Sequence, residues 1–274
     1  MPSVDLTTLP GWASLSTGSH NITIVAKADG YRDSEPSAAV SVTKGPAVVM
    51  PNKGDIITLD SKQYRVLKTE GTVAEVLCMY DSNSRVKFDS ASSRYNNTYA
   101  GKSLDTYCNQ TFYNSLSSTM QNAIVAKTFQ QDEWWRDFGT SGGTGNPIYQ
   151  GIYDTTGSNG YRVGLTNATK GTSISRKCYV LSCQDVIDYL EVTPSMDITN
   201  TTLTVSNIRK MFWNQTTSIS SFPWLRSARA GQSKTDEAFG VSGTLGCLDS
   251  FRVDNGRKIR PAFQIDLSKI SWSK

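Results

Sequence analysis

The segment FPWLRSARAGQSKTDEAFG, residues 222–240, indicates the fold of the larger part of the chain. It begins as a buried strand does, with Phe222, Trp224 and Leu225, and then becomes small, polar and charged without an apolar period. A second ordered segment, IRPAFQIDLS, follows at 259–268. The chain therefore holds an irregular stretch between two segments that have the character of core strands.

The two ordered segments carry residues that suit a rigid scaffold. Trp224 is large and apolar enough to anchor a strand in a core, and Pro261 suits a strand start or a bulge. Arg226 and Arg260 can hold buried turns by donating hydrogen bonds to backbone carbonyls or carboxylates. We therefore expect these four residues to belong to the scaffold.

The residues between the two scaffold segments have mixed chemistry and need not touch the core. An ordered scaffold that carries irregular, chemically mixed loops is typical of a recognition surface. The alternative is that these residues form solvated loops without a partner. The candidate ligand-binding residues are Arg229, Gln232, Lys234, Asp236, Cys247, Asp249, Ser250, Phe251, Arg252, Asp254 and Asn255.

The pattern changes along the chain and predicts two units joined by a linker. In the first unit, residues 1–44, NITIVAKA (21–28) alternates apolar and polar residues and predicts a half-buried strand, and the period returns in AVSVT. Prolines and glycines predict a linker over 45–54. Residues 55–274 form the second unit, a single domain.

Short strands lie on both sides of a helical middle in the second unit, which predicts an α+β fold whose two ends meet in one sheet. Ser103 is expected to cap the first helix, and Ser182 with Asp185 a later one. The Gly- and Ser-rich segment 137–177 predicts a long loop or hairpin excursion. The expected elements are strands in 55–80, two helical pieces in 102–129, helices at 182–190 and 205–214, and strands at 222–227, 237–242, 250–254 and 259–267.

Composition and charge argue against several classes of protein. The chain has 28 basic and 24 acidic residues, a net charge of +4, without a dense run of Lys or Arg. Nucleic-acid binding usually needs a concentrated basic stripe, so no nucleic-acid partner is expected. The five cysteines are odd in number and scattered. This indicates buried reduced thiols rather than a disulfide framework.

The residues of common catalytic sites are missing. The single histidine, His20, lies in the first unit, which excludes a Ser-His-Asp, Cys-His or histidine-rich metal site in the second. Acidic pairs such as Asp236 and Glu237 would serve a glycosidase only if they faced each other across a cleft. SGGTGNP (141–147) lacks the lysine of a phosphate-binding loop. We therefore expect no catalytic residue, cofactor or metal.

The beginning of the sequence has no basic start and apolar run of a signal peptide, and no stretch approaches the length of a membrane span. No membrane insertion is expected. The chain is expected to be intracellular, released without a signal, or cut from a longer parent.

Several blocks of the second unit resemble a bacterial and phage domain family with a C-type-lectin-like fold. The resemblance spans nearly all of 54–269 in matching order, and WLRS followed by RPAF is its most specific pair. In the first unit, residues 15–43 resemble the last strands of an immunoglobulin-like or fibronectin type III-like module, so a small all-β fragment of one is expected. The blocks are GDIITLDSKQYRVLK (54–68), YAGKSLDTYCNQTFYNSLSSTMQNAIV (99–125), CYVLSCQDVIDYL (178–190), WLRS (224–227), AFGVSGTLG (238–246) and IRPAFQIDLS (259–268).

The resemblance implies a scaffold with paired terminal strands and long loops that present a binding face. The same fold is shared by formylglycine-generating enzymes and by variable proteins of diversity-generating retroelements, whose ligand-contacting residues lie in a similar C-terminal segment. The sequence departs from calcium-dependent lectins, because Glu35-Pro36-Ser37 lies in the wrong unit and no Trp-Asn-Asp follows. Cys247 alone does not reproduce the cysteine pair of the copper-dependent oxidases.

The leading hypothesis is a non-enzymatic binding protein on a virion or bacterial cell surface, with a cytoplasmic location left open. Its variable C-terminal loops, diversified by a retroelement or used for phage receptor binding and adhesion, would contact a protein or glycan. The second hypothesis is a structural module for tail-fibre or cell-surface assembly. The third is an oxidase related to formylglycine-generating enzymes, or a glycoside hydrolase. The oligomeric state stays open.

Overall fold

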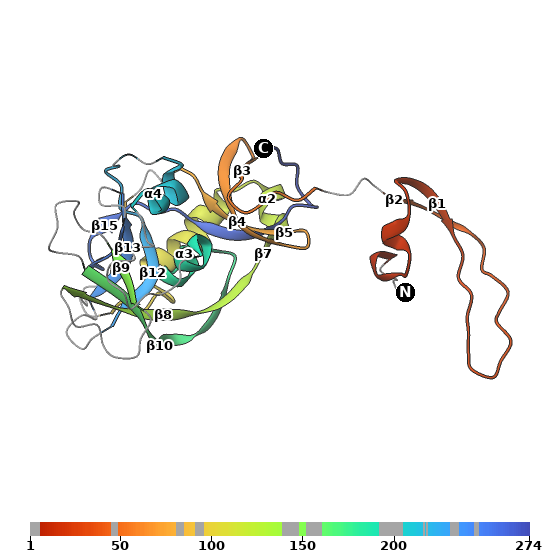
Figure 1. Cartoon of the computed structure of the whole chain (residues 1–274), viewed down its shortest axis with the longest axis horizontal. Helices are drawn as coiled ribbons and strands as arrows, with labels where there is room; N and C mark the ends of the chain where they lie inside the picture. The colour runs from red at the N-terminus through yellow and green to blue at the C-terminus, as the bar shows by residue number, and fades with distance from the viewer. Residues whose placement is uncertain are drawn as a thin grey trace. The chain divides into compact units, whose positions relative to one another are not determined.

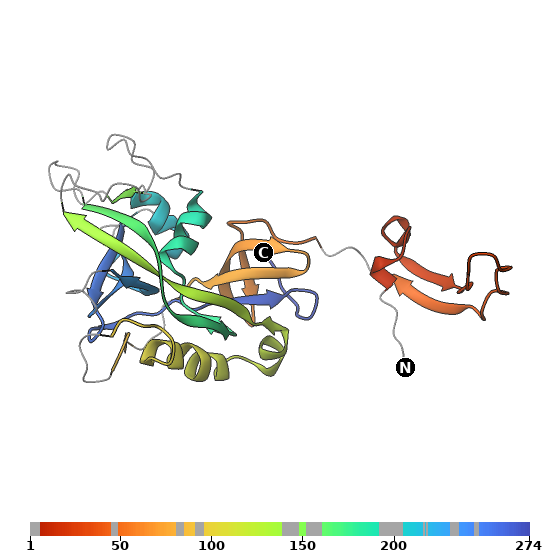
Figure 2. The ribbon, with the colours of Figure 1, turned by 90° about the horizontal axis from the view of Figure 1, so that it is seen from below.

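The computed structural model describes residues 6–44, 49–80, 85–90, 96–138, 148–151, 161–191, 205–215, 217, 219–230, 236–243 and 247–274. The chain divides into two compact units, Met1–Val49 and Met50–Lys274, which appear with their elements in Figures 1 and 2. All the candidate binding residues belong to the second unit.

The first unit contains one antiparallel two-stranded sheet and two short 3-10 turns. The strands are β1 (Gly18–Ile22) and β2 (Val40–Lys44), and the turns are η1 (Leu6–Thr8) and η2 (Trp12–Ser14). The ammonium group of Lys44 connects the sheet to the second turn by donating to the carbonyl oxygens of Trp12 and Ala13, at 2.8 and 2.9 Å.

The predicted half-buried strand over 21–28 is wrong beyond Ile22, where β1 ends. The backbone amide of Ile24 donates instead to the hydroxyl oxygen of Ser37, at 3.0 Å. Ile24 is 64% exposed and Val40 is 62% exposed. An isolated pair of strands has no second layer to cover its apolar face, so the alternation in the sequence finds no core to face.

The second unit is an α+β domain in which one sheet, here called the terminal sheet, joins the beginning and the end of the domain. Its order is β11-β16-β5-β4-β3, and β7 also pairs with β16. The last strand pairs with β5, and a bridge joins Thr58 to Ser273, so the prediction that the two ends meet in one sheet is confirmed. The strands are β3 (Ile56–Leu59), β4 (Lys62–Glu70), β5 (Val73–Cys78), β7 (Ile124–Val125), β11 (Cys178–Tyr179) and β16 (Ala262–Asp266).

The second sheet has the order β14-β13-β12-β8-β10-β9 and carries the C-terminal candidate residues. Its neighbours are antiparallel except β12 and β8, which are parallel. A separate ribbon pairs β6 with β15. The strands are β8 (Lys127–Phe138), β9 (Ile148–Gly151), β10 (Tyr161–Arg176), β12 (Trp224–Arg229), β13 (Glu237–Ser242), β14 (Cys247–Arg252), β6 (Val86–Lys87) and β15 (Gly256–Arg257).

A long hairpin of β8 and β10 accounts for the Gly- and Ser-rich excursion predicted at 137–177. The two strands run side by side in Figures 1 and 2, and register shifts interrupt their pairing at two places. The hairpin form of that prediction is therefore confirmed, while residues 139–147 and 152–160 lie outside the described part of the chain.

Four α-helices are described, and one of them continues into a π-helix. Ser182 caps α3 as predicted: its hydroxyl accepts from the amide of Asp185 at 3.0 Å, and the Asp185 carboxylate accepts from the amide of Ser182 at 2.8 Å. The helices are α1 (Ser103–Thr106) with the π-helix η3 (Tyr107–Phe112), α2 (Ser118–Ala123), α3 (Cys183–Leu190) and α4 (Val205–Trp213).

Two expectations about the helical middle are wrong. Ser103 does not cap α1, because Lys102 occupies the N-cap position and the Ser103 hydroxyl accepts from the amide of Ser90 at 2.9 Å. The second helical piece ends at Ala123 instead of continuing to residue 129. The β-branched residues that follow Ala123 pair with β16 as strand β7, so sheet formation overrides the helical pattern there.

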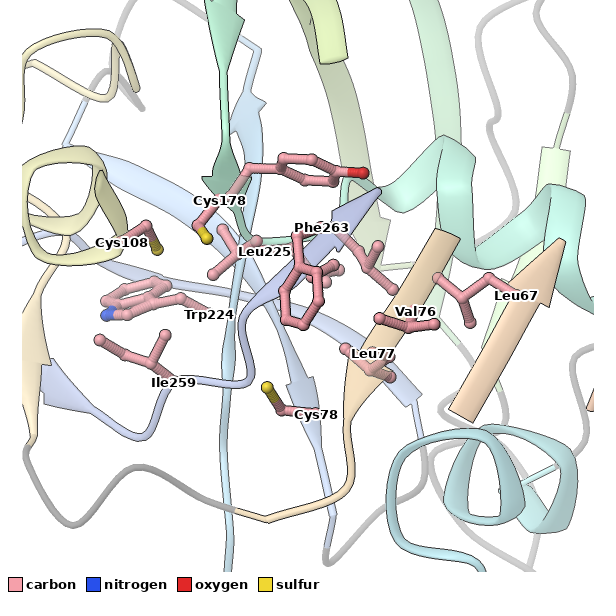
Figure 3. Packing of buried hydrophobic residues seen from close by; sticks show 14 of the residues in the cluster. Leu67, Val76, Leu77, Cys78, Cys108, Cys178, Trp224, Leu225, Ile259 and Phe263 are labelled. Atoms are coloured by element: carbon pink, nitrogen blue, oxygen red, sulfur yellow. The ribbon is translucent and has the colours of Figure 1, made fainter. Parts of the chain in front are cut away.

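The core lies between the two sheets and the helices. Trp134 and Trp224 are among its largest fully buried side chains. In Figure 3, Phe263 of β16 lies with Val76 and Leu77 of β5 on one side and Leu225 of β12 on the other. Packing between strands of different sheets therefore fixes the position of β12, from which the C-terminal segment starts.

Gly243 lies where the chain leaves β13 and is packed against the backbone of residues 219–221. A Cβ atom there would lie 2.6 Å from the carbonyl oxygen of Ile219 and 2.7 Å from that of Ser221. Replacing Gly243 by alanine is therefore expected to lower the free energy of unfolding by about 1–3 kcal/mol. Denaturant unfolding measures this loss. In the control Gly256→Ala, the Cβ would first meet the Arg85 Cβ at 3.3 Å; an equal loss in both variants would contradict the prediction.

Candidate ligand-binding site

Buried arginines hold both ends of the C-terminal segment. The guanidinium of Arg226 donates to the carbonyl oxygen of Val180 at 2.7 Å and lies 2.6 Å from a carboxylate oxygen of Asp185. Arg260 donates to the carbonyl oxygen of Phe212 at 2.5 Å. These contacts are of the kind expected from the sequence. Arg226 thus binds the segment that follows β11, and Arg260 binds the C-terminal end of α4.

The other two scaffold residues are also buried. The indole nitrogen of Trp224 donates to the carbonyl oxygen of Val86 at 2.9 Å, so the ring satisfies its one polar group while packing in the core. The carbonyl of Pro261 accepts from the amide of Cys78 at 2.9 Å, just before β16 begins. The start of β12 and the start of β16 are therefore both tied to neighbouring elements.

Arg226 ends a row of four alternating charges, here called the ion-pair row: Glu75, Lys127, Asp185 and Arg226. The ammonium of Lys127 lies 2.7 Å from an oxygen of Glu75 and 3.3 Å from an oxygen of Asp185. The guanidinium of Arg226 also stacks on the ring of Phe129, 4.2 Å from its centroid. Because its members come from β5, β8, α3 and β12, the ion-pair row connects the two sheets through α3.

The ion-pair row sets the pKa values of the carboxylates around it. Burial alone would raise the pKa of Asp185, but the charges of Arg226 and Lys127 outweigh burial and hold that pKa well below its usual range. Burial raises the pKa of Asp132, and the charge of Arg226 with a hydrogen bond from Ser227 offsets only part of that rise. One aspartate is thus held strongly ionised and its neighbour is pushed toward the neutral form.

A pocket of about 250 Å³ lies beside the ion-pair row. The charges of Glu75, Lys127 and Asp185 are bound to one another, so these groups neutralise each other within the protein. The pocket therefore offers a ligand little uncompensated charge at its inner end. Its lining residues are Lys53, Leu67, Lys68, Glu75, Lys127, Asp185, Asp188 and Tyr189.

Two of the candidate binding residues are held inside the second sheet. Ser250 is 7% exposed, and its hydroxyl donates to a carboxylate oxygen of Glu237 at 2.7 Å. Arg229 forms an ion pair with the same carboxylate and lies 3.3 Å from the Ser250 hydroxyl. The expectation that these residues could vary without touching the core is wrong, because they connect β12, β13 and β14.

Phe251 also contradicts that expectation. Its ring is half-buried and packs against Phe222 and Trp224, with centroids 6.2 Å apart in each case. The guanidinium of Arg257 lies over the Phe251 ring, 3.3 Å from its centroid. Phe251 is therefore a packing residue that joins β14 to the core, a role that the irregular sequence around it does not reveal.

The turn that follows β14, residues 252–255, remains open to solvent at Arg252 and Asn255. Arg252 and Asp254 form an ion pair at 3.0 Å, with side chains 47% and 37% exposed. The hydrogen bonds that Arg252 donates to the Asp254 carboxylate raise the pKa of Arg252. The 252–255 turn therefore presents a positive, a negative and an amide group together at the end of a strand in which Leu248, Ser250 and Phe251 are packed.

The remaining candidate residues fall into two groups. Asp236 and Asp249 are half-exposed at the ends of β13 and within β14. Gln232 and Lys234 lie outside the described residues, as does the side chain of Cys247, whose backbone begins β14. The structure places Asp249 and Arg252 on one strand, β14. Residues 231–235 of the irregular segment lie outside the described part of the chain.

Several residues of this region were not predicted from the sequence. Arg257 and Glu237 are the clearest, because each acts on a partner from another strand. The segment GRKIRP (256–261) shows that Arg257 lies close to the scaffold residue Arg260. The neighbouring sequence does not show, however, whether an arginine stacks on aromatic rings or lies in solvent. The only sequence signal for Glu237 was its position at the start of a predicted strand.

The described cysteines are buried and free, as predicted, at positions 78, 108, 178 and 183. Burial raises the pKa of the Cys78 thiol to about 12 and that of the Cys108 thiol further, so both stay protonated near neutral pH. In the part of the chain that the structure describes, no three His, Cys, Asp or Glu residues gather in a way that could hold a metal ion. None of the described helices is both long and apolar enough to cross a membrane.

Comparison with known proteins gives one match. The model of a family described as Domain of unknown function (DUF6273) matches residues 72–267, which include the whole second sheet, the terminal sheet from β5 onward and the 252–255 turn. No curated protein and no solved structure matches the chain.

Proposed function

Since the chain belongs to the DUF6273 family, a domain of unknown function, we propose that it is a non-enzymatic ligand-binding protein with its binding face at the C-terminal strands. The partner is a protein or a glycan on a cell surface, and the chain acts from a virion or a bacterial surface. We propose a C-type-lectin-like fold for the second unit, and the presence of its first and last strands, β3 and β16, in one sheet supports this.

One observation carries the proposal: the 252–255 turn exposes Arg252 and Asn255, while the described residues that lead to it are held by packing and hydrogen bonds. Arg226 and Arg260 hold the two ends of the segment through buried hydrogen bonds. Phe251 and Ser250 hold the strand that leads to the turn. A rigid support beneath exposed polar groups lowers the entropy lost on binding, which is what a recognition surface requires.

Charged side chains at the turn suit polar recognition. Arg252 offers a planar fork of donors, Asp254 accepts hydrogen bonds, and Asn255 does both. Because Arg252 and Asp254 already pair with each other, they are held in one geometry before a ligand arrives. A protein epitope or a saccharide could exchange its own polar groups for this ion pair at little ordering cost.

The double variant Arg252→Ala/Asp254→Ala tests the proposed face. It removes one positive and one negative charge, so the net charge is unchanged. We expect retention of the full chain on an array of bacterial surface glycans and surface proteins, and at least a tenfold loss of affinity in the double variant, equivalent to about 1.4 kcal/mol. Surface plasmon resonance with the retained ligand gives the affinities, and circular dichroism checks the fold.

The matched control is Lys27→Ala/Asp33→Ala, which removes an exposed ion pair of 3.0 Å in the first unit. It should leave the affinity unchanged. Equal binding by all three proteins would place the ligand elsewhere on the chain. If nothing on the array is retained, the binding function fails and an assembly role becomes the better explanation.

A further inference from the structure

Arg257 is an arginine held against aromatic rings at the edge of the candidate face. It lies on β15, which pairs with β6. Its guanidinium is 3.3 Å from the Phe251 centroid and 5.5 Å from the centroids of Phe222 and Trp224. Stacking of this kind fixes the plane of the guanidinium and leaves its outer edge available for hydrogen bonds.

No described residue neutralises this guanidinium. Its Nε atom is buried without a hydrogen-bond partner among the described residues. Asp249 on β14 attracts Arg257 electrostatically and raises its pKa, but does not form an ion pair with it. Removing a cation from water costs free energy unless an anion or hydrogen-bond acceptors replace the lost hydration. The guanidinium of Arg257 therefore lacks an acceptor that would compensate for its burial.

A second arginine lies beside the first. The chain at Arg85 packs against β15 so closely that a Cβ on Gly256 would lie 3.3 Å from the Arg85 Cβ. Arg85 is exposed. Burial lowers the pKa of Arg257 to about 10, and the neighbouring charge of Arg85 adds to that effect. Two neighbouring cations repel each other and therefore favour the binding of an anion.

We propose that Arg257 and Arg85 form a binding site for an oxyanion, namely a carboxylate, phosphate or sulfate group. Arg257 provides a stacked, rigid fork of the kind that binds planar or tetrahedral oxyanions through two parallel hydrogen bonds. Arg85, which directly precedes β6, adds an exposed second guanidinium beside it. Phe251, on which Arg257 stacks, directly precedes the 252–255 turn. A ligand bound at this turn is therefore expected to carry an anionic group that reaches Arg257. This last step rests on the proposed function.

Titration with sodium sulfate at constant ionic strength tests the site directly. The probe signal is the Arg257 Nε–H resonance in ¹H–¹⁵N spectra of the full chain, identified by its loss in Arg257→Lys. We expect a saturable shift in the wild-type protein and a sulfate affinity at least about fivefold weaker in Arg85→Gln. Arg85 is exposed, so this variant should fold normally. Thermal unfolding provides a second readout, because a bound anion raises the midpoint.

The control is Arg32→Gln, which removes an exposed arginine of the first unit. Its sulfate affinity should match that of the wild type. The inference is overturned if sulfate, phosphate and acetate all fail to give saturable binding, or if Arg85→Gln binds sulfate as the wild type does. Either result is independent of the ligand array, so failure of this site and failure of the proposed function can be told apart.

A comparison of inorganic sulfate, glucose 6-sulfate and glucose separates the two sources of the oxyanion. Tighter binding of glucose 6-sulfate than of inorganic sulfate, without binding of glucose, assigns the site to a charged saccharide. Equal binding of the two sulfates assigns it to a free ion. Both results support the oxyanion site, whereas binding of glucose as tight as that of glucose 6-sulfate contradicts it.

Discussion

Replacing Arg226 by methionine is expected to lower the free energy of unfolding by about 3–5 kcal/mol. The guanidinium is 4% exposed, and its loss leaves Asp185 without its nearest cation and the carbonyl of Val180 without a donor. Methionine fills much of the same volume, so the loss reports the missing charge and hydrogen bonds rather than a cavity. Urea unfolding at neutral pH, followed by fluorescence and circular dichroism, gives the difference.

Arg252→Met is the matched control for that measurement. Arg252 also pairs with an aspartate, but its side chain is 47% exposed. An exposed ion pair contributes about 0–1 kcal/mol, so this variant should unfold close to the wild type. If both variants lost the same stability, the ion-pair row would not be the structural link between the sheets.

The variant Asp185→Asn should be unstable in a pH-dependent way. At pH 7 we expect a loss of about 3 kcal/mol, because Arg226 and Lys127 lose the carboxylate between them. The pKa of Asp185 in the folded state lies below its unfolded value of about 3.9. Its contribution is therefore complete above that value and is lost as the pH falls through the folded-state pKa. The stability gap between wild type and variant should narrow below about pH 4.

Asp132 does not disturb this comparison. Burial raises its folded-state pKa, so protonation of Asp132 at falling pH favours folding, the opposite sign to Asp185. Both proteins keep Asp132, and the charge of Asp185 is the smallest of the causes that shift its pKa, so most of its effect cancels in their difference. Unfolding at pH 7, 5 and 3 gives the profile. Asp188→Asn, on the same helix but exposed, should show a small gap at every pH; a constant gap for Asp185→Asn would contradict the assignment.

The elements that were predicted well have their signals within a few neighbouring residues. Ser182 and Asp185 satisfy each other across one helical turn, so the start of α3 can be read locally. The wrong predictions depend on distant partners. Residues after Ala123 join a strand more than a hundred positions later in the sequence, and the alternating residues after Ile22 lack a second sheet to cover them.

The sequence predicts where the exposed 252–255 turn lies, but not which of its neighbours are packed. The segment between the scaffold residues does carry the exposed 252–255 turn. Ser250 and Phe251 look as variable as their neighbours in the sequence, yet both are packed, because Glu237 and Trp224 lie across from them. Only the register of β12, β13 and β14 distinguishes a packed polar residue from an exposed one, and a single sequence does not contain that register.

The position of β16 has a consequence for how the protein is made. This strand lies inside the terminal sheet, between β11 and β5, although it is the last strand to be synthesised. During translation, β5 must wait with an unpaired edge until almost the whole domain has left the ribosome. Unpaired edges are prone to aggregation, and pairing between residues so far apart in sequence is slow. The edge of β5 is therefore expected to be the part of the nascent domain most open to mispairing until β16 emerges.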